Sequence, residues 1–124
     1  MKKVYLATLA LAALPFTAFA DNCDQPRDDF DNLYCLNKVY IQADKDLNTA
    51  YKALRGYLNS SEKKTLKTGQ IEWINHRNDD CSDYNDRGFF VNLRCAADTT
   101  IDRTNFLQDR IRECKATGCQ PSKL

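Results

Sequence analysis

The sequence predicts an all-α fold, in which an antiparallel helical hairpin and a third helix form a three-helix bundle stapled by disulfides. Three observations support this prediction. Apolar residues recur at spacings of three and four, the period of an amphipathic helix. Runs with the alternating polarity of a strand are absent from the sequence. Six cysteines in so short a chain indicate a disulfide framework.

The first helix is expected over residues 28–58. Asp28 can cap it, and Asp31 in the first turn favours its positive N-terminal end. Charged and amide residues fill most positions between the apolar ones, so one stripe should be buried and the rest exposed. The stripe consists of Leu33, Leu36, Tyr40, Ala43, Leu47, Ala50, Leu54 and Leu58.

Asn59-Ser60-Ser61 interrupts this pattern, and Ser60 or Ser61 is the expected N-cap of a second helix over residues 61–86. Trp73 is expected to anchor the core from this helix. A polar stretch over residues 82–92 then leads to the third helix, which should end near Cys114. The second helix carries Leu66, Trp73, Ile74, Arg77, Cys81 and Tyr84, and the third carries Leu93, Ala97, Ile101, Phe106 or Leu107, and Ile111.

Two arginines, Arg77 and Arg103, recur at the spacing of nearby apolar residues. One interpretation places them partly inside the bundle, bonded to acceptors such as Asn48 or Gln70. The alternative is that they form a polar patch offered to a partner.

The helical layout constrains how the cysteines pair. Cys114 lies about 28 Å from Cys95 along the third helix, at 1.5 Å per residue, so its easy partner is Cys119. At the other end of the bundle, Cys81–Cys95 would staple the second and third helices, and Cys23–Cys35 would pin the N-terminal segment. Crossed pairings among those four cysteines remain open.

Residues 1–20 have the pattern of a secretory signal peptide. Lys2 and Lys3 precede an apolar run, and Ala18-Phe19-Ala20 supplies small residues for cleavage before Asp21. A membrane anchor is disfavoured because the run is short and contains Pro15. A lipid on Cys23 is disfavoured because a lipoprotein signal has a small residue, Gly, Ala or Ser, directly before the lipidated cysteine, and this chain has Asn22 there. The expected product is a single domain over residues 21–124, periplasmic or secreted, where disulfides persist.

The composition of residues 21–124 points away from several classes of activity. Sixteen basic and 17 acidic residues give a formal charge of −1, so binding to nucleic acid or to an anionic membrane is not expected. No second apolar run follows residue 20, so no membrane insertion is expected either. His76 is the single histidine and no metal-binding motif occurs, so we expect no metal and no cofactor. The neighbouring carboxylates of Asp79 and Asp80 point in different directions on a helix, so they do not converge on one reacting atom as a catalytic pair would. The sequence therefore predicts a protein without enzymatic activity.

The segment from Ser82 to Phe90 is the best candidate for a binding surface. It combines aromatic side chains and an arginine, which are favoured at interface hot spots, with an expected disulfide clamp that limits the entropy lost on binding. The alternative is that its two phenylalanines close the end of the bundle. The predicted partner-binding residues are Tyr84, Asp86, Arg87, Phe89 and Phe90.

Three segments resemble the LprI-like family of small exported bacterial proteins, some of which inhibit lysozyme. These are the A-D-x-x-L-N-x-x-Y segment over residues 43–51, the W-I-x-x-R signature over residues 73–77, and a closing segment from Cys95 to Leu107. The resemblance implies a helical fold, export, and a protein partner such as a peptidoglycan hydrolase. Two classes of function follow. One is an inhibitor of a cell-wall hydrolase, either a lysozyme or a competitor's toxin. The alternative is an envelope structural or stress protein with no enzyme target.

Overall fold

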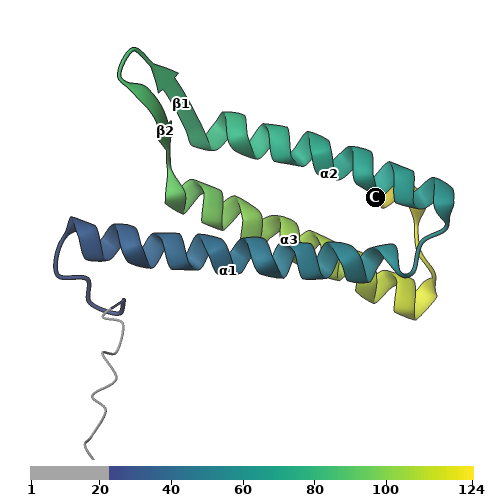
Figure 1. Cartoon of the computed structure of the whole chain (residues 1–124). Helices are drawn as coiled ribbons and strands as arrows, with labels where there is room; N and C mark the ends of the chain where they lie inside the picture. The colour runs from purple at the N-terminus through teal and green to yellow at the C-terminus, as the bar shows by residue number, and fades with distance from the viewer. Residues whose placement is uncertain (1–22) are drawn as a thin grey trace, which may run out of the picture.

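The computed structural model describes residues 23–124, so the expected signal peptide, its cleavage site and Asn22 lie outside the described residues. Three long helices are joined by short connections, and a small β-hairpin projects at one end (Figure 1). The elements are α1 (Asp29–Arg55), α2 (Ser60–Cys81), β1 (Ser82–Asn85), β2 (Gly88–Val91), α3 (Leu93–Thr117) and the short 3-10 helix η1 (Pro121–Lys123).

Side-chain caps fix where the first two helices begin. Asp28 caps α1 as predicted, because its carboxylate accepts a hydrogen bond of 2.9 Å from the Asp31 amide. For α2 the predicted serine cap is wrong. Asn59 caps this helix, because its side chain accepts a hydrogen bond of 2.9 Å from the Glu62 amide; the Asn59 amide in turn donates one of 2.9 Å to the Glu62 carboxylate, which completes a capping box. The reciprocal pair satisfies two backbone donors, whereas a serine cap at position 60 or 61 would begin the helix later.

The closest helix pair is α1 with α3. Short side chains fill their interface, which lets the two backbones approach each other. The buried threonine hydroxyls bond within α3, Thr100 to the Ala96 carbonyl at 2.6 Å and Thr104 to the Thr100 carbonyl at 2.9 Å. The short buried residues of this interface are Ala43, Ala50, Ala96, Ala97, Thr100 and Thr104. The chain does reverse between α1 and α2 as predicted, but these two helices are not the closely packed pair.

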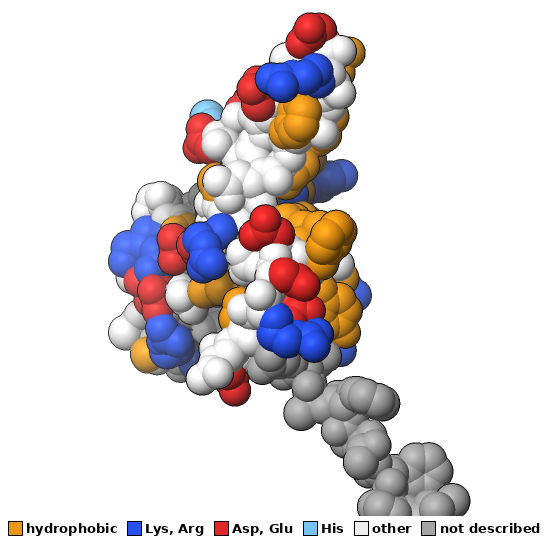
Figure 2. All heavy atoms as spheres, turned by 90° about the vertical axis from the view of Figure 1, so that its left-hand side faces the viewer, with side chains coloured by type: hydrophobic (Ala, Val, Ile, Leu, Met, Phe, Trp, Pro, Cys, Tyr) orange, Lys and Arg blue, Asp and Glu red, His pale blue; other side chains and the backbone are white. Residues whose placement is uncertain are grey.

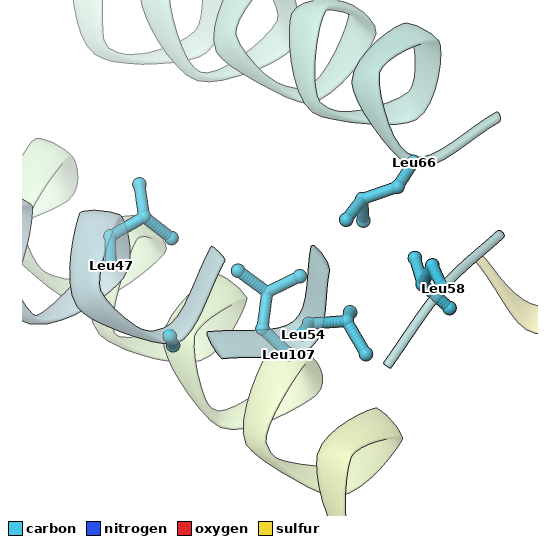
Figure 3. Close-up of a cluster of buried hydrophobic side chains, with 6 residues drawn as sticks. Leu47, Leu54, Leu58, Leu66 and Leu107 are labelled. Carbon is cyan, nitrogen blue, oxygen red and sulfur yellow. The ribbon is translucent and has the colours of Figure 1, made fainter. Parts of the chain in front are cut away.

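Larger side chains separate α2 from the other two helices. Near the start of α2, Leu66 is fully buried and points toward leucines of α1 and α3 (Figure 3). Further along, the half-buried Trp73 packs against this same core. The core cluster contains Leu47, Ala50, Leu54, Leu58, Leu66 and Leu107.

The predicted apolar stripe of α1 is buried only over part of its length. Ala43, Leu47, Ala50 and Leu54 are buried, but Leu33 is 55% exposed. Figure 1 shows the reason: the first turns of α1 extend past the start of α3, so no helix covers them. The expectation of burial at Leu33 is therefore wrong. On α3, Ile101 is likewise 40% exposed, contrary to its predicted place in the core.

The all-α prediction fails between α2 and α3. The second helix ends at Cys81 rather than residue 86, and residues 82–91 form an antiparallel hairpin. Asp86 and Arg87 make its turn, where Asn85 accepts a hydrogen bond of 2.9 Å from the Arg87 amide. Gly88 closes the turn at φ +130°, a conformation that glycine adopts without strain. The turn chemistry and the Phe-Phe-Val run of β2 favour strand over helix here.

Three disulfides link the cysteines in the arrangement that the helical layout favours. They join Cys23 to Cys35, Cys81 to Cys95 and Cys114 to Cys119, with Cα–Cα distances of 5.5, 5.4 and 4.0 Å. The first two lie at the hairpin end of the bundle and the third lies at the opposite end. Over residues 23–124, no helix has the length and apolar character needed to cross a bilayer.

Candidate functional site

The β-hairpin rises from a base that is fixed on both sides. Cys81 is the last residue of α2, and its disulfide partner Cys95 lies in the first turn of α3. The Asn92 amide donates a hydrogen bond of 2.8 Å to the Cys81 carbonyl, while the Asn92 side chain accepts one of 3.0 Å from the Cys95 amide. The hairpin is thereby held to the ends of two helices.

The strand register divides the predicted binding residues between two faces. Tyr84 lies opposite Phe89, and Asp83 lies opposite Phe90. Because side chains alternate along a strand, Tyr84 and Phe89 share one face and Phe90 occupies the other. Asp86 and Arg87 form the turn between them. The structure therefore brings the predicted residues together in one element without placing all of them on one surface.

The aromatic side chains of the hairpin are largely in solvent. Tyr84 is 78% exposed, Phe89 66% and Phe90 48%. Exposure of this extent is inconsistent with the alternative that the two phenylalanines close the end of the bundle. It also corrects the expected place of Tyr84, which lies on β1 and not on the apolar face of the second helix.

A groove of about 340 Å³ lies at the foot of the hairpin. Its lining includes Phe89 and Val91 of β2 together with Asn37 and Tyr40 of α1. Sequence reasoning did not select these residues of α1, because Tyr40 belongs to the apolar stripe and was assigned to the core. The groove is lined by Asn37, Tyr40, Arg77, Asn78, Cys81, Ser82, Phe89, Val91, Leu93 and Ala96.

Arg77 supports the groove from α2. Its guanidinium lies 5.1 Å from the ring centroid of Trp73 and 5.9 Å from that of Tyr40, within the range of cation–π attraction. One nitrogen also donates a hydrogen bond of 3.4 Å to the Thr100 hydroxyl. These contacts join α1, α2 and α3 at the groove, which Arg77 itself lines, as the structural interpretation of this arginine predicts.

Arg103, on α3, makes similar contacts outside the groove. Its guanidinium lies 4.5 Å from the Phe106 ring centroid, and its Nε donates a hydrogen bond of 2.9 Å to Gln70. Burial lowers the pKa of this guanidinium. Of the two acceptors that the sequence offered, Gln70 is the one that bonds to Arg103, and the Asn48 side-chain nitrogen donates instead to the Asp44 carbonyl within α1.

A second exposed apolar region lies on the first turns of α1, at the same end as the hairpin. Phe30 is 82% exposed, Leu33 55% and Tyr34 54%, and the Cys23–Cys35 disulfide ties the preceding segment to this part of the helix. Figure 2 looks directly at this end and shows hydrophobic side chains along one side of both the projecting part and the helical part below it. The exposed apolar surface therefore extends beyond the hairpin.

The hairpin end of the molecule is acidic. Residues 23–34 and 79–94 together contain eight aspartates and three arginines, a formal charge of −5. Red side chains stand beside the hydrophobic ones in Figure 2. The aspartates are Asp24, Asp28, Asp29, Asp31, Asp79, Asp80, Asp83 and Asp86, and the arginines are Arg27, Arg87 and Arg94.

His76 is exposed on α2. Over residues 23–124, no three His, Cys, Asp or Glu side chains meet in a group that could hold a metal ion. What the described site offers is a contact surface: exposed aromatic rings, a groove beside them, and surrounding carboxylates.

Comparison with known protein families shows to which family the chain belongs. A sequence model of the family described as "Lysozyme inhibitor LprI" matches residues 21–107, which include α1, α2, the hairpin and over half of α3. No curated protein and no solved structure matches the chain.

Proposed function

Because the chain belongs to the lysozyme inhibitor LprI family, we propose that it is an exported protein that binds and blocks a cell-wall hydrolase without chemistry of its own. The target class is a lysozyme or a peptidoglycan-degrading toxin delivered by a competitor. Three disulfides in about one hundred residues suit an oxidising compartment such as the periplasm or the cell exterior. Such hydrolases act on the cell wall in that compartment.

The observation that carries this proposal is the clamped hairpin with its exposed aromatic rings. Large aromatic side chains in solvent are costly unless a partner covers them, and they supply most of the binding energy at many interfaces. The Cys81–Cys95 bridge holds the hairpin before the partner arrives. A surface fixed in advance loses less conformational entropy on binding.

The shape of the hairpin suits an open enzyme cleft. Strands of four residues, at about 3.3 Å per residue, carry the turn about 13 Å beyond the ends of the helices. In the proposed complex the turn of Asp86 and Arg87 enters the cleft first. Tyr84 and Phe89 then contact one wall and Phe90 the other. Substrate is excluded because the hairpin occupies its place.

The charge of this end supports a basic target. A formal charge of −5 around the hairpin raises the local concentration of a cationic enzyme and favours its approach. Carboxylates at the end of α2 and in the hairpin would also face basic groups on the rim of a cleft; they are Asp79, Asp80, Asp83 and Asp86.

The direct test measures peptidoglycan lysis by a panel of lysozymes and by toxins encoded beside the gene, with the purified protein at stoichiometric concentration. We expect slowed lysis by at least one enzyme. Changing Tyr84, Phe89 and Phe90 together to serine should abolish the protection while the helical circular dichroism signal is retained. A matched control changes three exposed apolar residues outside the groove, Tyr57, Ile71 and Ile101, to serine and should leave protection intact.

Two outcomes would contradict the proposal. If the hairpin variant protects as well as the parent, the hairpin is not the inhibitory site. If the parent protects against no enzyme in the panel, the inhibitor hypothesis fails and the envelope structural or stress role is favoured.

A further inference from the structure

The hydrogen-bond pattern of the hairpin determines which backbone groups point away from it. Cys81 and Asn92 form a hydrogen-bonded pair at its base, with 2.8 Å between the Asn92 nitrogen and the Cys81 oxygen. Hydrogen-bonded and non-bonded pairs alternate along an antiparallel ladder. The pairs Ser82–Val91 and Tyr84–Phe89 are therefore non-bonded, and the backbone N–H and C=O groups of these four residues point outward.

The two outer edges of the hairpin differ. On β1, the outward Tyr84 amide is already satisfied, because it donates a hydrogen bond of 2.8 Å to the Asp83 carboxylate. On β2, no hydrogen bond within residues 23–124 satisfies the outward backbone groups of Phe89 and Val91. The strand Gly88-Phe89-Phe90-Val91 also lacks the charged residue or proline by which most proteins protect a strand edge. The edge of β2 is the open one.

This open edge adjoins the groove. Phe89 and Val91 line it together with Asn37 and Tyr40 of α1. In Figure 1, β2 is the strand of the hairpin that lies farther from α2, so that helix does not cover its edge. A strand added here would have both a backbone to pair with and a groove for its inward side chains.

We propose that the edge of β2 binds an extended, basic segment of the target enzyme as a third strand, with alternate side chains of that segment entering the groove beside Phe89 and Val91. The inference rests on the proposed function and specifies how the target is held. Backbone hydrogen bonds provide affinity in this mode and the groove provides selectivity. Beyond the outer edge, exposed Phe30, Leu33 and Tyr34 on α1 lie at the same end to contact flanking residues.

The negative charge of the hairpin end favours a basic partner at the edge of β2 over a second copy of this chain. A second copy of this chain could pair edge to edge, but that would bring together two ends with a formal charge of −5 each. Repulsion between them disfavours the pairing at low salt. A basic segment of another protein gains attraction from the same aspartates.

Hydrogen–deuterium exchange on the free protein and on its complex with an inhibited hydrolase tests the proposal directly. We expect the Phe89 and Val91 amides to exchange freely in the unbound protein and to become protected in the complex. If the hydrolase binds but these amides still exchange freely, the third-strand inference is wrong and the proposed function stands. If no hydrolase binds, the proposed function fails and the inference fails with it. Protection in the free protein that grows with concentration would instead show self-pairing and overturn the choice of occupant.

A pair of substitutions at Val91 separates the backbone from the side chain. Val91→Pro removes the outward N–H, which no ladder bond uses, so the hairpin should remain folded. Val91→Thr keeps that N–H and a branched side chain of similar size. We expect the proline variant to bind the hydrolase about tenfold more weakly than the threonine variant, since it loses one interstrand hydrogen bond and its ring obstructs the new strand. Equal affinity of the proline variant and the parent would overturn the proposal.

Discussion

At the scale of single residues, the Trp73 ring contacts two guanidinium groups. Its ring centroid is 5.1 Å from Arg77 and 6.0 Å from Arg103, and the ring also packs against the leucine core. We expect Trp73→Ala to lower the free energy of unfolding by about 3 kcal/mol, since it removes both the apolar contacts and the surface on which the two cations lie. Ile71→Ala on the exposed side of α2 is the matched control, with an expected change below about 0.5 kcal/mol. Chemical denaturation measures both. A loss below about 1 kcal/mol for Trp73→Ala would mean that this ring contributes little to the core.

At the scale of elements, two glycines should respond in opposite ways to substitution by alanine. Gly88 ends the hairpin turn at φ +130°, where an alanine is strained although nothing lies within 4 Å of its Cβ. Gly69 lies inside α2, where an added Cβ meets its nearest neighbours at 3.9 Å, an ordinary contact. We expect Gly88→Ala to destabilise the hairpin by about 1–2 kcal/mol and Gly69→Ala to stabilise the protein by about 0.5–1 kcal/mol. Amide exchange over residues 82–91 and thermal unfolding measure the two effects. Stabilisation by both alanines would show that the turn tolerates another conformation.

The β-hairpin is the part of the fold that the sequence did not predict. The three helices could be predicted because their apolar residues, such as those from Leu47 to Leu54, recur with the helical period over several turns. The lengths of these helices in turn predicted which cysteines lie close together. The hairpin has strands of only four residues, too short to show a period, and Ser82 to Asn85 is polar enough to resemble a loop. The two-residue turn before Gly88, followed by Phe-Phe-Val, was the available signal. The groove wall at Asn37 and Tyr40 depends on how far α1 extends past α3, which a single sequence does not encode locally.

At the scale of the whole molecule, the distribution of charge is more informative than its sum. Residues 21–124 have a formal charge of only −1 in total, but the residues at the hairpin end, 23–34 and 79–94, have a formal charge of −5. The remaining described residues, 35–78 and 95–124, carry 13 basic and eight acidic side chains, a formal charge of +5. Much of this positive charge lies on α2 near its start, at Lys63, Lys64 and Lys67, and on α3 near its end, at Arg112 and Lys115. Figure 1 shows that the start of α2 and the end of α3 lie at the end opposite the hairpin, so the charged residues give the protein an acidic pole at the hairpin and a basic pole at that opposite end.

This polarity predicts how association with a basic hydrolase depends on salt. Steering by separated charges is screened over a Debye length of about 10 Å at 0.1 M salt, so the association rate constant should fall about tenfold between low and high ionic strength, with a smaller change in the dissociation rate. Changing Asp79, Asp80, Asp83 and Asp86 to asparagine should remove most of this dependence, because those four aspartates flank or lie in the hairpin. Changing Lys63, Lys64 and Lys67 to glutamine alters a similar amount of charge at the opposite pole, and it should leave the association rate unchanged or slightly faster. Surface plasmon resonance at several salt concentrations provides all of these rates. If the lysine and aspartate variants slow association equally, the position of the charge does not matter and the acidic pole does not steer the target.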